Sequence, residues 1–322
     1  MPAATLALVG LLLVTASWGS TFYMLRGVVA RMPAADFLAV RFVLAAVVVG
    51  LVVRVAAPRA LRALDGTDRR RALLLGGVYG VAQLLQTIGL ESTAASVSGF
   101  VTGLYVVLTP LLAALFLRAR LGGRVWSAVA LATTGLAVLS LQGLALGGGE
   151  LLTLAGALFY ALHVVGLGVW SRPGTALGMT VVQLVAISAV CAVGAVPGGL
   201  TLPTTSGDWT ILVYMAVVAG ALALVIQTWA QAQVSSTRAA VFMTMEPVWA
   251  AAFAVAFGGE SLGPRAVAGG ALVLSAMYLV ELGSAGSSSS GSPQGLVEED
   301  PDELTPLVPQ RDQVGVGELA RC

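Results

Sequence analysis

The sequence predicts an all-α membrane protein with ten transmembrane helices, arranged as two inverted five-helix repeats. Its composition is the first reason, since 57% of the 322 residues are hydrophobic and 10% are charged, against about 25% charged in soluble domains. Apolar windows near 20 residues then recur along the first 283 positions, and each can cross a hydrocarbon core of roughly 30 Å. Finally, the chain matches itself when it is shifted by 141 residues.

The first half contains the predicted spans 4–25, 33–53, 72–90, 95–117 and 125–146, and the second half contains 151–170, 176–196, 209–231, 237–258 and 264–283. Gly76 and Gly80, four residues apart, suit close contact between helices. The two repeats are therefore assigned to residues 1–146 and 147–283. Residues 284–322 are rich in Ser, Gly, Pro and acidic residues, which predicts a disordered cytoplasmic tail.

The distribution of arginine predicts the orientation, because short loops with excess positive charge remain in the cytoplasm. With the N-terminus inside, eleven arginines lie in inner loops and three, Arg26, Arg31 and Arg265, lie in outer loops. We therefore expect a multi-pass protein of the plasma membrane with both termini in the cytoplasm. The cluster at residues 69–71 is interpreted as this topology signal, so no nucleic-acid partner is expected.

The internal repeat aligns polar residues as well as apolar ones. The shift superimposes Gln86 and Thr87 on Gln227 and Thr228, and Trp18 on Phe159. Each repeat holds five spans, an odd number, so the second repeat enters the membrane with the opposite orientation. Many secondary transporters have this architecture, with the substrate site near the midplane where the repeats meet.

Several stretches resemble the EamA-like group of the drug/metabolite transporter superfamily over roughly residues 5–283. They include SWGSTFYMLRG (17–27), FLAVRFVLAA (37–46), GFVTGLYVVLTPLLAALFL (99–117) and the segment 235–274. The resemblance implies a carrier of metabolites or drug-like solutes, often an exporter, that works by alternating access. The chain departs from the family pattern at Ala119, where the family usually has a glutamate after the fourth helix.

Two charges are expected deep in the membrane. Glu246 lies about nine residues into its span from the cytoplasmic side, or ~13 Å at the rise of an α-helix. Arg41 lies about eight residues into its own span from the outer side, or ~12 Å, so in a core of roughly 30 Å the two levels differ by only a few ångströms. An intramembrane charge costs at least about 2.5–3.5 kcal/mol on insertion scales and is usually paired or functional. Two interpretations stay open: a static Arg41–Glu246 pair that fixes helix packing, or cavity charges that bind an ionic substrate or exchange a proton.

Other candidates for the cavity are polar or aromatic residues near mid-depth. His163 is the only histidine and could relay protons or bond to a neighbouring helix. Gln83 and Gln86 share one helix face, and Gln227 lies on another, so these amides should point inward. Trp18 and Tyr105 are the preferred aromatic wall residues. The candidate residues for substrate or coupling are therefore Arg41, Glu246, His163, Trp18, Tyr105, Gln83, Gln86 and Gln227.

Pro110 and Pro247 are candidate hinges, since a proline bends a helix and frees backbone carbonyls. A packing kink is the alternative for each.

The remaining patterns narrow the class of function. The sequence lacks a Gly-Lys-Ser/Thr phosphate loop, which argues against ATP-driven transport. We expect no metal, no cofactor and no catalytic residues, because no reactive cluster occurs at a common depth. The predicted function is export of a small amino-acid-like metabolite. Efflux of lipophilic cationic drugs is the alternative, ahead of an intramembrane enzyme or a tail-mediated sensor. The expected partners are the lipid bilayer, the solute and protons or another coupling ion; a homodimer is left open.

Overall fold

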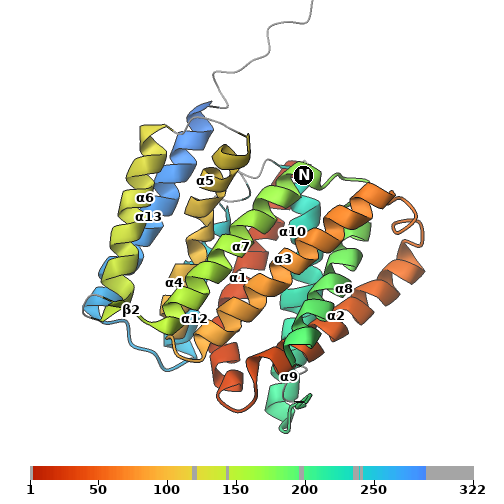
Figure 1. Ribbon diagram of the computed structural model, residues 1–322, viewed down its shortest axis with the longest axis horizontal. Helices are drawn as coiled ribbons and strands as arrows, with labels where there is room; N and C mark the ends of the chain where they lie inside the picture. Colours follow the sequence, from red (N-terminus) through yellow and green to blue (C-terminus); the bar gives the residue numbers. More distant parts are fainter. Residues whose placement is uncertain are drawn as a thin grey trace, which may run out of the picture.

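The computed structural model describes residues 3–117, 122–142, 145–195, 199–234, 239 and 242–287. The described chain is helical apart from one two-residue hairpin, and its helices form an elongated bundle (Figure 1). Seven helical segments are long and apolar enough to span a membrane, and two apolar segments are shorter. Together with the 18-residue helix Gly123–Ser140, these segments fall at the ten predicted spans.

The first half consists of α1 (Ala3–Val29), α2 (Ala34–Ala56), α3 (Gly66–Leu90), α4 (Ala95–Gly103), α5 (Tyr105–Leu117) and α6 (Gly123–Ser140), followed by β1 (Leu141–Gln142) and β2 (Ala145–Leu146). The second half consists of α7 (Gly148–Trp170), α8 (Ala176–Ala195), α9 (Ser206–Ala216), the π-helical η2 (Val217–Leu222), α10 (Ala223–Gln231), α12 (Glu246–Ala256) and α13 (Pro264–Ser287).

Three predicted spans are interrupted. The span 95–117 divides at Leu104, whose N–H bonds to the carbonyl of Val101 only three residues earlier. The span 209–231 contains the wider π-helical turns of η2. In the span 237–258, a turn at residues 244–245 is followed by α12, which begins at Glu246.

These interruptions correct the predicted positions of the bends. Pro247 lies in the first turn of α12, where its missing N–H would have no helical partner in any case, so it begins a helix where a bend was expected. Pro110 lies inside α5, about one and a half turns after the interruption at Leu104.

Two span ends also differ from the prediction. The span expected at 125–146 ends as a helix at Ser140, and its last residues form the strands β1 and β2, which pair antiparallel. At the other end of the chain, α13 continues to Ser287, four residues beyond the predicted span. The rest of the predicted tail, and Ala119, lie outside the described residues.

The central helices form two groups, and each group combines helices from both halves of the sequence. In the α1 group, α1 packs against α12 and against the continuous segment formed by α9, η2 and α10. In the α3 group, α3 packs against α7, and α7 also contacts α4 and α5. Helices α2 and α8 pack together at one end of the bundle, and α6 and α13 pack together at the other (Figure 1).

An ion pair lies inside each of these groups. Arg31, after α1, pairs with Asp208 in the first turn of α9. Arg172, after α7, pairs with Asp68 in the first turn of α3 at 2.8 Å. Residues 31 and 172 are 141 apart in the sequence, and residues 68 and 208 are 140 apart. The two ion pairs are therefore equivalent positions of the two repeats.

Close packing between α3 and α8 depends on glycine. A Cβ atom at Gly76 would meet the backbone carbonyl of Gln183, and one at Gly80 would lie 2.9 Å from Cβ of Val190. A Cβ at the neighbouring Gly77, by contrast, would meet no atom within 4 Å.

We predict that Gly76→Ala lowers the melting temperature of the purified protein in detergent. The added methyl group must displace backbone, which costs about 1–3 kcal/mol in a packed core. Gly77→Ala is the matched control, expected to leave the melting temperature unchanged or slightly raised because alanine favours the helix. Equal melting temperatures for the two variants would contradict the assigned contact between α3 and α8.

Candidate functional site

A cavity lies between the α1 group and the α3 group, with a volume of about 40 Å³ for the centres of water-sized spheres. Helices α1, α10 and α12 line one side of it, and α3, α4, α5 and α7 line the other. Arg41 of α2 and Met243, before α12, complete the wall. The eight candidates from the sequence all line this cavity, namely Arg41, Glu246, His163, Trp18, Tyr105, Gln83, Gln86 and Gln227. The structure thus brings them together, while their part in transport stays a prediction.

Arg41 of α2 is 2% exposed and binds neutral oxygen atoms only. Its Nε donates to the backbone carbonyl of Met215 at 3.1 Å, and its Nη1 donates to Oε1 of Gln83 at 3.3 Å. The guanidinium also lies 4.7 Å from the centroid of the Phe42 ring. These contacts fix the side chain in place and leave its positive charge without an anionic partner.

Glu246 is 5% exposed and lies in the first turn of α12. Its Oε2 accepts a hydrogen bond from the hydroxyl of Tyr105 at 3.2 Å. Within the described part of the chain, no ion pair joins this carboxylate to Arg41. The predicted static pair of Arg41 with Glu246 is therefore not present, although both charges line the same cavity.

On the α3 side of the cavity, amide side chains form hydrogen bonds with the hydroxyl groups of neighbouring wall residues. Gln83 donates through Nε2 to the hydroxyl of Tyr79 at 3.3 Å. Gln86 donates to Oγ1 of Thr102 at 3.0 Å and accepts from the hydroxyl of Tyr160 at 2.8 Å. On the opposite wall, the side-chain oxygen of Gln227 is buried and has no hydrogen-bond partner. It is therefore an acceptor available to a bound solute.

His163 of α7 is 1% exposed and lies at the edge of the cavity. Its Nε2 is 2.8 Å from Oε1 of Gln183 on α8. The imidazole ring also meets the Tyr79 ring edge to face, with centroids 4.9 Å apart. The histidine thus has the contact with a neighbouring helix that was one of its two expected roles.

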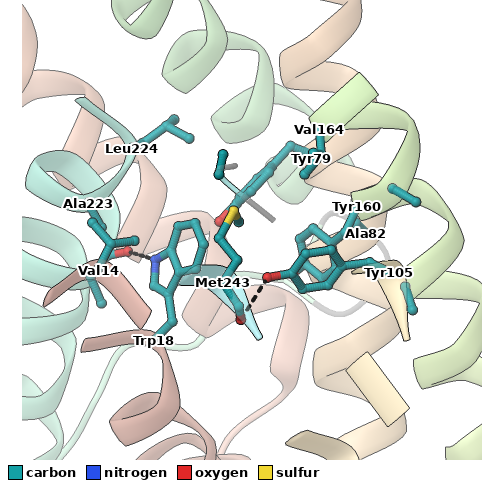
Figure 2. Packing of buried hydrophobic residues seen from close by; sticks show 14 of the residues in the cluster. Val14, Trp18, Tyr79, Ala82, Tyr105, Tyr160, Val164, Ala223, Leu224 and Met243 are labelled. Atoms are coloured by element: carbon teal, nitrogen blue, oxygen red, sulfur yellow. Dashed lines mark hydrogen bonds between the residues drawn. The ribbon is translucent and has the colours of Figure 1, made fainter. Parts of the chain in front are cut away.

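The π-helical segment η2 supports two of the cavity residues. The indole N–H of Trp18 donates to the carbonyl of Ala219 within η2 at 2.9 Å. Arg41 is held by the carbonyl of Met215, two residues before η2 begins. Figure 2 shows Met243 between the rings of Trp18 and Tyr105, with the Tyr105 hydroxyl directed at the Met243 carbonyl, 3.4 Å away. A π-helical turn leaves carbonyls free for such side chains, and these turns are frequent at functional sites.

Several lining residues were absent from the candidates. Tyr79 lies four residues before Gln83 and seven before Gln86, so helical periodicity alone would place it on the same face. Thr102 and Met243 both line the cavity and are 141 residues apart, as are Tyr105 and Glu246. Extending the repeat alignment to every polar position would have found the first pair.

Two other aromatic residues of α1 and α12 lie away from the cavity. Tyr23 and Trp249 stack with Phe253 on the α1–α12 contact and do not line the cavity. The described residues also contain no group of three or more His, Cys, Asp or Glu side chains with the arrangement of a metal site.

The chain matches the model of the EamA-like transporter family twice, over residues 5–141 and 147–282. It is 31% identical over 274 residues to a protein named "Uncharacterized transporter" from Archaeoglobus fulgidus, and the match covers 85% of each chain. A solved structure described only as "Crystal structure of protein" is similar with a TM-score of 0.62 at 17% identity, covering 88% of this chain and 98% of that one. At this identity the likeness concerns the fold alone.

The family resemblance in the sequence is thus confirmed. The chain belongs to the EamA-like transporter family, as a multi-pass membrane transporter with two EamA domains and not an enzyme.

Proposed function

We propose that this protein is a secondary transporter that exports a small amino-acid-like metabolite by alternating access around the cavity. The observation that carries the proposal is the presence of two buried opposite charges, Arg41 and Glu246, in one cavity without an ion pair between them. In this proposal ten helices cross the membrane as two inverted repeats, with both termini in the cytoplasm. The excess of arginine in the predicted inner loops supports that orientation.

Arg41 is suited to bind an anionic group of the solute. A guanidinium has five N–H donors, and Met215 and Gln83 each accept from one of them. A buried charge without a partner is costly, whereas a carboxylate from the solute would accept short charge-assisted hydrogen bonds. Binding a carboxylate at Arg41 therefore removes an electrostatic cost that the empty cavity carries.

The opposite side of the cavity is suited to a cationic group. Glu246 has one hydrogen-bond donor, the Tyr105 hydroxyl, and the oxygen of Gln227 has none. An ammonium group has three N–H donors and could bond to both oxygens. The rings of Trp18, Tyr105 and Tyr160, which line the cavity, add a surface that attracts cations. A solute with both an ammonium and a carboxylate group satisfies both sides.

Glu246 also supplies a means of coupling to a proton gradient. A buried carboxyl group can bind either a proton or the ammonium group of the solute. In this scheme each solute that leaves the cavity outward is replaced by a proton at Glu246. An ionised carboxylate without either partner is costly in a low-dielectric interior. This cost opposes the change of the empty, unprotonated cavity from the outward-facing to the inward-facing state.

Efflux of lipophilic cations is the second candidate, favoured by the aromatic rings around the one cavity carboxylate. The two candidates differ in their need for Arg41, because a cation without an anionic group gains nothing from a guanidinium.

We predict that Glu246→Gln reduces export at least roughly tenfold, because the amide keeps the shape of the side chain and loses its charge. The measurement is untargeted mass spectrometry of the medium from cells with matched membrane levels of each protein, with empty vector as the background. Glu91→Gln is the matched control, since Glu91 is exposed at the end of α3. Equal enrichment of the same solute by Glu246→Gln and the native protein would refute this role of Glu246.

We also predict that Arg41→Gln abolishes export of amino-acid-like solutes and leaves export of lipophilic cations unchanged. Loss of a charged hydrogen-bond partner in a buried site costs at least about 1.5–3 kcal/mol, or roughly tenfold or more in affinity. Arg54→Gln on the exposed end of the same helix is the control and should behave as the native protein. The measurement is uptake of radiolabelled amino-acid-like solutes, and separately of radiolabelled lipophilic cations, into inside-out vesicles. Transport of lipophilic cations but of no amino-acid-like solute, by the native protein and Arg41→Gln alike, would favour the second candidate.

A further inference from the structure

Glu260 lies in the segment between α12 and α13, and its side chain binds two separate parts of the chain. Its carboxylate accepts from the N–H groups of Ala95 at 2.7 Å and Ser96 at 3.1 Å, and from the hydroxyl of Ser96 at 2.6 Å. Arg26, in the last turn of α1, donates to the same carboxylate at 2.7 Å. We call this set of contacts the Glu260 clamp.

The clamp supplies a helix cap that α4 lacks locally. The residue at the N-cap of α4 is Ala94, whose methyl group cannot accept a hydrogen bond. Helices α3 and α9, by comparison, are capped by their own Asp65 and Thr205. The first N–H groups of a helix have no partner within the helix, so α4 depends on a carboxylate 165 positions away in the chain.

The clamp connects the two helix groups on either side of the cavity. Glu260 follows α12, and Arg26 belongs to α1, so both belong to the α1 group. The N–H groups that they hold belong to α4 of the α3 group. The ion pairs of Arg31 and Arg172, in contrast, each lie within one group.

Below the clamp, α4 and α12 are in direct contact. A Cβ atom at Gly99 would lie 2.5 Å from Cβ of Ala250, and one at Gly103 would lie 3.0 Å from Cγ of Pro247. No side chain separates the two helices at these positions. The cavity is therefore closed at this end by backbone packed against side chain, with the clamp at the top of the contact.

The clamp is ionic at neutral pH. Burial opposes the charge on Glu260, but the hydrogen bonds from Ser96, Ala95 and Arg26 outweigh this effect and lower the pKa of Glu260 below its ordinary value. The carboxylate thus remains available as an acceptor for all of its partners.

We propose that Glu260 is a gating residue, which holds the cavity closed at the α4–α12 end and has to release α4 before the cavity opens to that face. The inference rests on the proposed alternating access, and the orientation proposed above makes this face the external one. The repeat-equivalent position, 119, is an alanine, which cannot supply a carboxylate to the opposite face.

The experiment measures access to the cavity from each side of the membrane. Thr21 lines the cavity, and its hydroxyl bonds only to the carbonyl of Trp18 in its own helix, so Thr21→Cys is a mild reporter. With Cys191 and Cys322 replaced by alanine, a membrane-impermeant maleimide is added to right-side-out or inside-out vesicles. We expect Glu260→Gln to raise the external labelling rate at least tenfold, with an intermediate increase for Arg26→Gln. Glu91→Gln should have no effect.

Unchanged external labelling in Glu260→Gln, or an increase found only in inside-out vesicles, would overturn the proposed gate. Because labelling requires no solute, this result is separate from the export measurement: loss of export in Glu246→Gln with unchanged labelling would retain the proposed function and reject the gate. Faster external labelling of Glu260→Gln, with no solute exported by the native protein, would retain the gate and reject the proposed function.

A second measurement shows whether the clamp is formed in the folded protein. A glutamate with a lowered pKa stabilises the folded state at pH values above its ordinary pKa of about 4.5. This stabilisation disappears as the pH falls through the lower pKa that the group has in the folded protein. The charged group that contacts Glu260 is Arg26, which stays protonated throughout. The native protein should therefore melt at a higher temperature than Glu260→Gln at pH 7, and the difference should vanish at acidic pH. A difference independent of pH would contradict an ionised clamp.

Discussion

Hydrocarbon offers no hydrogen bonds, so each backbone group freed by an interrupted helix must find a partner within the protein or in a water-filled cavity. This constraint explains why the irregular helices surround the cavity. The division between α4 and α5 and the start of α12 lie at its wall, and the π-helical η2 contacts the lining residue Trp18. The carbonyl of Ala219 is used by Trp18, and the carbonyl of Met215 by Arg41. The helix interruptions and the cavity are therefore connected, because backbone carbonyls near the interruptions hold side chains that line the cavity.

The same constraint determines how a buried arginine is tolerated. Two neutral oxygens and one aromatic ring hold the Arg41 side chain, which fixes its geometry without neutralising its charge. Glu246 instead bonds to Tyr105, at the repeat-equivalent position. The repeat thus places a hydroxyl and a carboxyl group where a strictly symmetric protein would have two identical residues.

Much of the fold and the membership of the cavity could be predicted, since both depend on patterns that sequence preserves. Hydropathy located the spans, and the rule that polar groups face inward selected eight residues that share a cavity. The contacts among them could not be predicted. Equal depth suggested an Arg41–Glu246 pair, but depth says nothing about the rotation of each helix about its axis. The π-helical turns of η2 could not be predicted either, because its six residues are ordinary helix formers in a membrane.

Glu260 was missed for a related reason: a glutamate in a glycine-rich connection is usually solvated, and only the tertiary structure brings the uncapped end of α4 to it. Its position also bears on how the protein divides into moving parts. The sequence suggests a division into two repeats, whereas the packing groups α1 with α10 and α12, and α3 with α7. The equivalent ion pairs of Arg31 and Arg172 join helices of different repeats within each group. A motion of one repeat against the other would break both pairs, whereas a motion of one group against the other retains them and breaks the Glu260 clamp alone among these ionic contacts. Because each group contains helices from both repeats, the ion pairs favour the α1 group and the α3 group, and not the two repeats, as the parts that move.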